Sequence, residues 1–230
     1  MSMKQTKELA DSLEDVLPQT QCTKCSYPDC RAYAQAMATG EAPPNRCPPG
    51  GVEGIKRLSA ILTPIFPQDA IELHPTIDPA CGLERPRPVA FIDPKTCIGC
   101  TLCIQACPVD AIVGASKQMH VVLTDWCTGC DLCIPPCPVD CITMINMTGN
   151  KTGWDAWSPE LAQMSRSRYE ARDARLDREE QDNNDRLAKK AAAKLVALNA
   201  ENPDSETALK EQERKRAIIA AAIARAQQQK

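Results

Sequence analysis

Apolar side chains recur at helical spacing near the start of the chain. The leucines and the valine of residues 4–17 fall on one face of a helix, which Pro18 would end. Residues 31–38 and 54–62 indicate two shorter helices. We therefore expect a small, mainly helical domain over residues 1–70.

Short β-prone runs replace helical spacing further along the chain. Two of them lead into cysteine-rich motifs and two follow these motifs. Placing residue 97 over residue 127 matches eleven of the sixteen positions that start there, so the segment is an internal repeat. We expect a pseudo-twofold α+β domain over residues 89–146. The runs are residues 89–92, 111–113, 120–124 and 141–145.

The remaining segments have no apolar periodicity. Residues 71–88 are rich in proline, which indicates an extended linker. Residues 147–230 are rich in alanine and in charge of both signs, which favours helix, with a break at Asn202-Pro203 and a second helix over residues 206–229. A solvated or partly disordered tail is the plainer interpretation. The sharper one is an arm that docks on a partner or an anionic surface through residues 215–226, KRAIIAAAIARA.

The repeat carries chemistry, because each copy is a C-x2-C-x2-C-x3-C-P motif. Three cysteines at such short gaps can wrap a loop around one cubane, and the fourth ligates the other cluster in a two-cluster ferredoxin. Structural zinc, the competing use, has no need of a third cysteine at this spacing or of the trailing proline. We predict two 4Fe-4S clusters, one held by Cys97, Cys100, Cys103 and Cys137 and one by Cys107, Cys127, Cys130 and Cys133.

A further four cysteines lie in the N-terminal domain with the spacing C-x2-C-x4-C-x16-C. This spacing also suits a zinc site or a set of packed thiols. Sharing a chain with two iron-sulfur motifs favours a third 4Fe-4S cluster, which would bring the total to three. Its ligands would be Cys22, Cys25, Cys30 and Cys47.

For the remaining cysteines and the two histidines we expect structural roles. Cys141 occupies the place of Ala111 in the repeat and is expected to be a small buried side chain, and Cys81 in the linker is expected to be incidental. His74 and His120 are expected to be structural, and we predict no catalytic residue. Five apolar side chains are expected to shield the ferredoxin clusters from water, namely Ile98, Leu102, Ile104, Leu132 and Ile134.

Composition narrows the class of protein. Aromatic residues are only 3% of the chain against 14 cysteines, so metal clusters are expected to replace part of an apolar core. We see no secretory signal and no apolar run long enough to cross a bilayer, which predicts a reducing, cytoplasmic location. Residues 1–146 carry eleven basic and sixteen acidic side chains. This excess of acid disfavours nucleic acid and suits redox partner proteins with basic patches, such as a flavoprotein or ferredoxin reductase.

The order of these parts resembles the B subunit of the Rnf/Rsx ion-translocating electron-transport complex. The similarity runs over about residues 9–146 and includes LPQTQC, RCPPGG, CIGCTLCIQACPVDAIVGASKQMH and CTGCDLCIPPCPVDCI. The resemblance implies three 4Fe-4S clusters on the twelve cysteines above, which relay electrons within a membrane-associated oxidoreductase complex. Members of the family begin with a membrane-spanning helix that this sequence lacks, so we expect a ferredoxin-like variant that reaches the inner membrane only through partner subunits.

The leading hypothesis is therefore an iron-sulfur electron carrier. The expected fold is α+β: a pseudo-twofold two-cluster ferredoxin module after a small helical four-cysteine domain and before a helical tail. An enzyme subunit with its own substrate site is one alternative, but the sequence has no dinucleotide-binding or phosphate-loop motif. A redox sensor that binds nucleic acid is another, and only the basic tail favours it.

Overall fold

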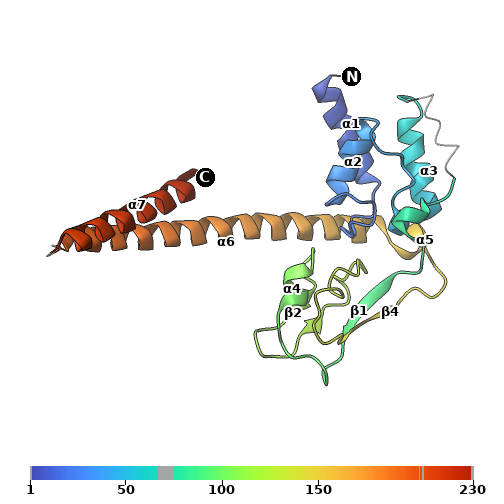
Figure 1. Cartoon of the computed structure of the whole chain (residues 1–230). Helices are drawn as coiled ribbons and strands as arrows, with labels where there is room; N and C mark the ends of the chain where they lie inside the picture. The colour runs from blue at the N-terminus through green and yellow to red at the C-terminus, as the bar shows by residue number, and fades with distance from the viewer. Residues whose placement is uncertain (1, 67–74, 202, 204, 229–230) are drawn as a thin grey trace. The chain divides into compact units, whose positions relative to one another are not determined.

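The computed structural model of the chain describes residues 2–66, 75–201, 203 and 205–228. These residues form two compact units, Met1–Arg172 and Asp173–Lys230. The first unit holds every cysteine of the chain. The two units are described separately below (Figure 1).

Three helices build the N-terminal part of the first unit: α1 (Met3–Asp15), α2 (Cys30–Ala38) and α3 (Gly51–Leu62). The hydroxyl of Ser2 accepts a hydrogen bond from the backbone N–H of Gln5, whose side chain accepts one in return, and this capping box starts α1. The helices bury Leu13, Tyr33 and Leu58 almost completely. Each such side chain stabilises the fold by roughly 1.5–3 kcal/mol. The short 3-10 helix η1 (Pro48–Gly50) leads directly into α3.

Residues 88–146, which include the segment predicted to be a ferredoxin module and are called the ferredoxin part below, contain two small antiparallel sheets and one short helix. Strand β1 (Pro88–Ile92) pairs with β4 (Ile142–Asn146), with Ala90 opposite Met144 (Figure 1). Strand β2 (Ile112–Val113) pairs with β3 (Val121–Val122), and α4 (Leu102–Ala106) lies between β1 and β2 in the chain. The two short sheets and the cysteine-rich loops between the strands share one buried core.

The sequence repeat is repeated in the backbone. Gly99 and Gly129 both have φ of 69°. Thr101 and Asp131 follow with φ of 66° and 68°, and Asp110 and Asp140 have φ of 50° and 49°. Each pair is thirty residues apart, so the two cysteine loops adopt the same sequence of left-handed turns.

Residues on either side of the ferredoxin strands pack against the rest of the first unit. Asn45 donates a hydrogen bond from Nδ2 to the backbone O of Thr76 at 3.2 Å, and Ile77 packs on the helical core. The chain then forms the 3-10 helix η3 (Pro79–Cys81). Much of the expected extended linker therefore lies against the N-terminal helices. Residues 71–74 of that linker, which include His74, lie outside the described residues.

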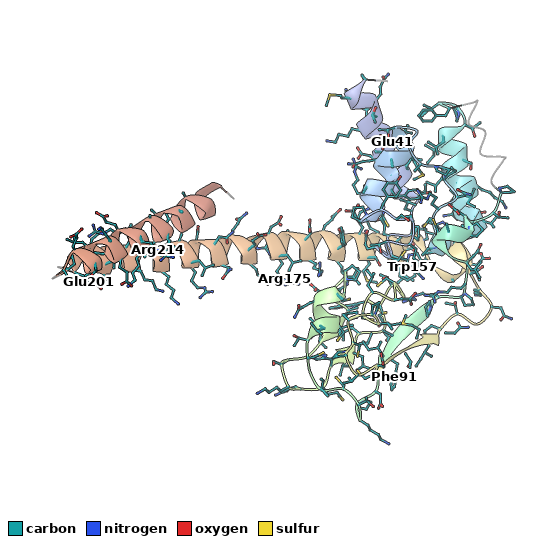
Figure 2. The ribbon with its side chains drawn as sticks, viewed as in Figure 1. Glu41, Phe91, Trp157, Arg175, Glu201 and Arg214 are labelled. Atoms are coloured by element: carbon teal, nitrogen blue, oxygen red, sulfur yellow. The ribbon has the colours of Figure 1, made fainter. Side chains whose placement is uncertain are left out.

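The start of the segment predicted as a tail is also packed. After α5 (Gly153–Ala156), the side chain of Trp157 is buried, and α6 (Pro159–Ala200) begins (Figure 2). Ala162 and Ser165 on α6 are buried, and Tyr169 packs against the ferredoxin core.

The second unit is a helical hairpin. The later part of α6 ends at Ala200, and α7 (Glu206–Gln228) runs back beside it (Figure 1). Gln212 is buried and donates hydrogen bonds from Nε2 to the backbone O of Leu198 at 2.6 Å and of Glu201 at 2.9 Å. The break predicted at Asn202-Pro203 therefore falls between two helices. The last residue of the predicted second helix, residue 229, lies outside the described residues.

These elements confirm the predicted fold class. Helix, small sheets and a helical C-terminal region occur in the expected order.

Candidate iron-sulfur centres

Four cysteine side chains line one cavity in the ferredoxin part. Cys127, Cys130 and Cys133 come from the second motif, and Cys107 comes from the end of the first. The cavity holds about 310 Å³ of empty space, part of it open to solvent. The structure thus brings together the four cysteines predicted for one cluster, and we name this group the second ferredoxin site. Apolar side chains form most of its remaining walls: Ala90, Val109, Ala111, Ile112 and Met144.

The other predicted ferredoxin group also comes together across the repeat. The Sγ atom of Cys137 lies 3.5 Å from that of Cys141, and the side chain of Cys97 bonds to the same Cys141 thiol. Burial and the nearby thiols of Cys100 and Cys97 raise the pKa of Cys103 to about 11. We name Cys97, Cys100, Cys103 and Cys137 the first ferredoxin site.

A second cavity lies in the N-terminal part. It is lined by Cys22, Cys25, Cys30 and Cys47, and it holds about 290 Å³ of empty space. Leu17, Tyr33 and Pro48 contribute to its walls. We name these four cysteines the N-terminal site. The number of residues between successive cysteines is uneven, so local spacing alone does not bring them together. Cys30 begins α2 and Cys47 directly precedes η1, so the fold around these two elements gathers the four cysteines.

Two buried glutamines hold the loop of the N-terminal site. The Nε2 atom of Gln19 donates to the backbone O of Glu14 at 2.7 Å, and that of Gln21 donates to Oε1 of Gln19 at 3.0 Å. The Oε1 atom of Gln21 accepts a hydrogen bond from the backbone N–H of Cys30 at 2.9 Å. Both side chains are at most 3% exposed. Neither role was predicted, although the motif LPQTQC contains both residues.

The backbone around the N-terminal site alternates in handedness. Gln19, Gln21 and Thr23 have φ of 55°, 52° and 58°, each separated by one residue outside the left-handed region, and Ser26 has φ of 69°. Gly99 and Thr101 in the first ferredoxin loop likewise have left-handed φ on either side of one residue outside that region. Both loops therefore bend sharply around their cysteines.

The thiols of these groups are strongly buried. Desolvation raises the pKa of Cys130 and of Cys133 each to about 12, and it also raises the pKa of Cys30 and of Cys47. Four buried thiolates need a compensating cation. Since metal binding removes the thiol protons, iron would supply that compensation.

Hydrogen bonds distinguish Cys137 from its neighbour Cys141. Despite desolvation, the pKa of Cys137 is lowered because the backbone N–H groups of Val139 and Cys141 and the Cys141 thiol bond to it. The pKa of Cys141 is raised to about 12, first by burial and then by Cys137. Cys141 is thus buried within hydrogen-bond distance of Cys137, and either sulfur can be the donor. The expectation that Cys141 is not a cluster ligand stays a prediction.

Cys81 is buried beside the N-terminal site. A hydrogen bond with the Cys81 thiol raises the pKa of Arg46, and Cys81 also acts electrostatically on Cys25. Spacing along the chain could not predict this position, because 33 residues separate Cys81 from Cys47, the nearest cysteine of the N-terminal site in the sequence.

The expected apolar shield is only partly present. Ile104 and Ile134 pack against the ferredoxin core, and Leu132 is half-buried. Ile98 and Leu102 are 57% and 38% exposed, so the prediction for these two was wrong. Ile98 lies in the first cysteine loop, whose left-handed turns remove the regular alternation that would direct apolar side chains inward, and Leu102 begins α4 directly after the left-handed Thr101.

Family comparisons agree with these positions. Residues 90–144 match a family model described as "4Fe-4S dicluster domain", and residues 17–49 match one described as "Putative Fe-S cluster". The first range contains all eight cysteines of the two ferredoxin sites, and the second contains all four of the N-terminal site. Iron-sulfur cofactors are therefore established for this chain.

Curated relatives share one name, that of the B subunit of an ion-translocating oxidoreductase complex. The protein of Stutzerimonas stutzeri is 50% identical over 154 residues, which cover 67% of this chain and 75% of that protein. This chain belongs to the B-subunit family. The proteins of Thiobacillus denitrificans and an Azoarcus species are 56% and 57% identical over 117 and 115 residues. Those matches cover 51% and 50% of this chain.

The matched length is limited in two of these relatives. The chain spans 58% of the length of the Thiobacillus denitrificans and Azoarcus proteins. In the part of this B-subunit family member that the structure describes, no helix is both long and apolar enough to cross a bilayer.

Proposed function

We propose that the chain relays single electrons through three 4Fe-4S clusters as part of an ion-translocating oxidoreductase complex. The single observation that carries this proposal is the gathering of twelve cysteines into three groups of four, each at a site with a left-handed loop or an apolar cavity. Bound 4Fe-4S clusters would each accept and release one electron. The protein residues hold, separate and desolvate them.

Contacts between loops support a relay of neighbouring sites. Thr128, next to Cys127, donates a hydrogen bond from Oγ1 to the backbone O of Thr20 at 2.9 Å, and this bond is buried. Lys24 of the N-terminal loop pairs with Asp131 of the second ferredoxin loop at 2.8 Å. The N-terminal site therefore adjoins the second ferredoxin site.

Further bonds fix this junction. Trp157 donates from Nε1 to the backbone O of Pro18 at 2.7 Å, and Arg87 lies over its ring at 4.5 Å. The same Arg87 donates to the backbone O of Cys127 at 2.9 Å. One buried tryptophan thus links the loop before the N-terminal site to the loop of the second ferredoxin site. A rigid junction of this kind keeps two redox sites at a constant separation.

The partners of the relay would be the other subunits of such a complex. We propose that the chain reaches the cytoplasmic face of the inner membrane through these subunits. The acidic balance of residues 1–146 supports partner surfaces with basic patches.

The cluster count is tested by iron and acid-labile sulfide per chain after anaerobic purification. Three sites with four irons each predict about twelve irons. A Cys22→Ala variant is expected to keep about eight, whereas Cys81→Ala, a matched control with an equally buried thiol beside the same site, keeps about twelve. Eight irons and one zinc in the unaltered chain would refute the N-terminal cluster. The same holds if Cys22→Ala retains every iron.

A further inference from the structure

The imidazole of His120 lies against the first ferredoxin site. Its side chain is 2% exposed, and its Nδ1 atom is 3.2 Å from Sγ of Cys103. Its Nε2 atom is buried and has no hydrogen-bond partner among the described residues. The chain has only two histidines, and this one is in contact with an expected cluster ligand.

The surrounding loop is built to hold the ring. A Cβ atom at Gly114 would lie within 3.1 Å of both Cα and Cγ of His120 and still closer to Cδ2. The loop that ends in His120 is fixed to the cysteine loop, because the backbone N–H of Lys117 donates to the O of Gly99 at 2.9 Å. The ring is therefore closely packed against Gly114, and its Nδ1 lies toward Cys103.

The chemistry of the ligand decides the direction of the hydrogen bond. A thiolate bound to iron can only accept a hydrogen bond, so we assign a hydrogen to Nδ1 of the imidazole. A hydrogen bond to a charged acceptor is stronger than one between neutral groups. It stabilises the more negative, reduced state of a cluster more than the oxidised state, and hydrogen bonds to the sulfurs are one determinant of cluster potential.

We propose that His120 is a positioning residue that raises the reduction potential of the first ferredoxin site through a hydrogen bond from Nδ1 to the Cys103 sulfur. This inference rests on the proposed function, because it requires a cluster at that site.

The second half of the repeat does not reproduce this arrangement. Cys133 corresponds to Cys103, and the structure records no side-chain hydrogen bond to its sulfur among the described residues. Thirty residues after His120 the chain has Asn150, which is exposed. Two sites with the same cysteine motif therefore receive different hydrogen bonds, which gives them different potentials.

The test is a redox titration of the full chain followed by electron paramagnetic resonance. His120→Leu removes the donor, and His120→Asn keeps an N–H near the position of Nδ1. Ile142→Val is a matched control, because Ile142 is buried in the same core without a polar group. A Cys97→Ala variant identifies which reduction step belongs to the first ferredoxin site.

In His120→Leu we expect that step to move to lower potential by about 59 mV, a tenfold change in the ratio of reduced to oxidised sites at a fixed potential. His120→Asn should restore most of the shift, and Ile142→Val should leave the step unchanged. An unchanged potential in His120→Leu with full iron content would overturn the proposal. An equal shift in the asparagine or valine variant would also overturn it, since packing alone would then explain the effect.

Iron content separates failure of this inference from failure of the proposed function. If the unaltered chain holds no cluster at the first ferredoxin site, the proposed function fails. If His120→Leu loses that cluster, the hydrogen bond is tested in the unaltered protein labelled with 15N-histidine. Pulsed electron paramagnetic resonance of the reduced chain should then show a weak 15N coupling that is absent in His120→Asn, and lack of the coupling would overturn the inference.

Discussion

A methyl group added at Gly99 is expected to dismantle the first ferredoxin site. Gly99 lies between Cys97 and Cys100 and has φ of 69°, in the left-handed region that favours glycine. A Cβ atom there would lie 2.5 Å from the backbone O of Gln118 and 2.8 Å from the backbone C of Lys117, and it would also meet the backbone N of Gln118. These are main-chain atoms, which cannot rotate away as a flexible side chain could.

The cost can be separated into two contributions with a matched glycine. Gly149 has φ of 61°, and a Cβ atom there would meet nothing within 4 Å. Gly149→Ala should therefore lose stability only through the strain of its left-handed backbone, which costs about 1–2 kcal/mol. Gly99→Ala has the same strain plus the clash with the 117–118 backbone. Overpacking adds about 1–3 kcal/mol, so the total is about 2–5 kcal/mol.

The two variants are compared by iron per chain and by the urea midpoint at which the visible absorbance of the clusters is lost. Gly99→Ala should lose about four of about twelve irons and have the lower midpoint, because its cysteine loop must move. Gly149→Ala should keep all of them. Equal iron content and equal midpoints in the two variants would show that the close contact at Gly99 has no energetic consequence, and the reasoning would be refuted.

Three further predictions concern the junction, the ligands and protons. Thr128→Val removes the hydrogen bond to the buried Thr20 carbonyl and should destabilise the chain by about 1–3 kcal/mol in thermal unfolding, whereas an unchanged midpoint would contradict the buried junction. Cys137→Ala should lose about four irons, while Cys141→Ala should keep about twelve, and the reverse result would exchange the roles of these cysteines. Burial raises the pKa of Cys130 to about 12, so thiol protons must leave as iron binds. Reconstitution with limiting iron should therefore weaken as pH falls from about 8.5 to about 6.5, and loading that does not depend on pH would contradict the release of thiol protons on iron binding. The raised pKa has the opposite effect on the iron-free fold, which should lose stability as pH rises from about 9 to about 12.

The fold could be predicted wherever local spacing determines it. The three N-terminal helices, the β-prone runs around the motifs and the break near Pro203 all follow from periodicity or from proline. The packing of the residues around Trp157 could not be predicted in this way. That segment resembles the later tail in composition, and its contact with Pro18 joins positions 139 residues apart.

In the candidate sites, too, the features set by local spacing could be predicted, and the contacts between distant residues could not. The crossed position of Cys107 followed from the repeat, since a cysteine that starts the next structural element points away from its own motif. The contact between His120 Nδ1 and Cys103 Sγ could not be predicted, because it depends on a loop that returns to the site after 17 residues. The exposure of Ile98 was mispredicted because a left-handed loop has no apolar period.

The central claim is that three one-electron sites lie in a single chain. A coulometric reductive titration of the anaerobic, full-length protein tests it most directly, because it counts electrons whatever the potential of each site. We predict uptake of about three electrons per chain, one for each site. Uptake of about two electrons at full iron occupancy of the ferredoxin sites would contradict the claim and leave the N-terminal cysteines outside the relay.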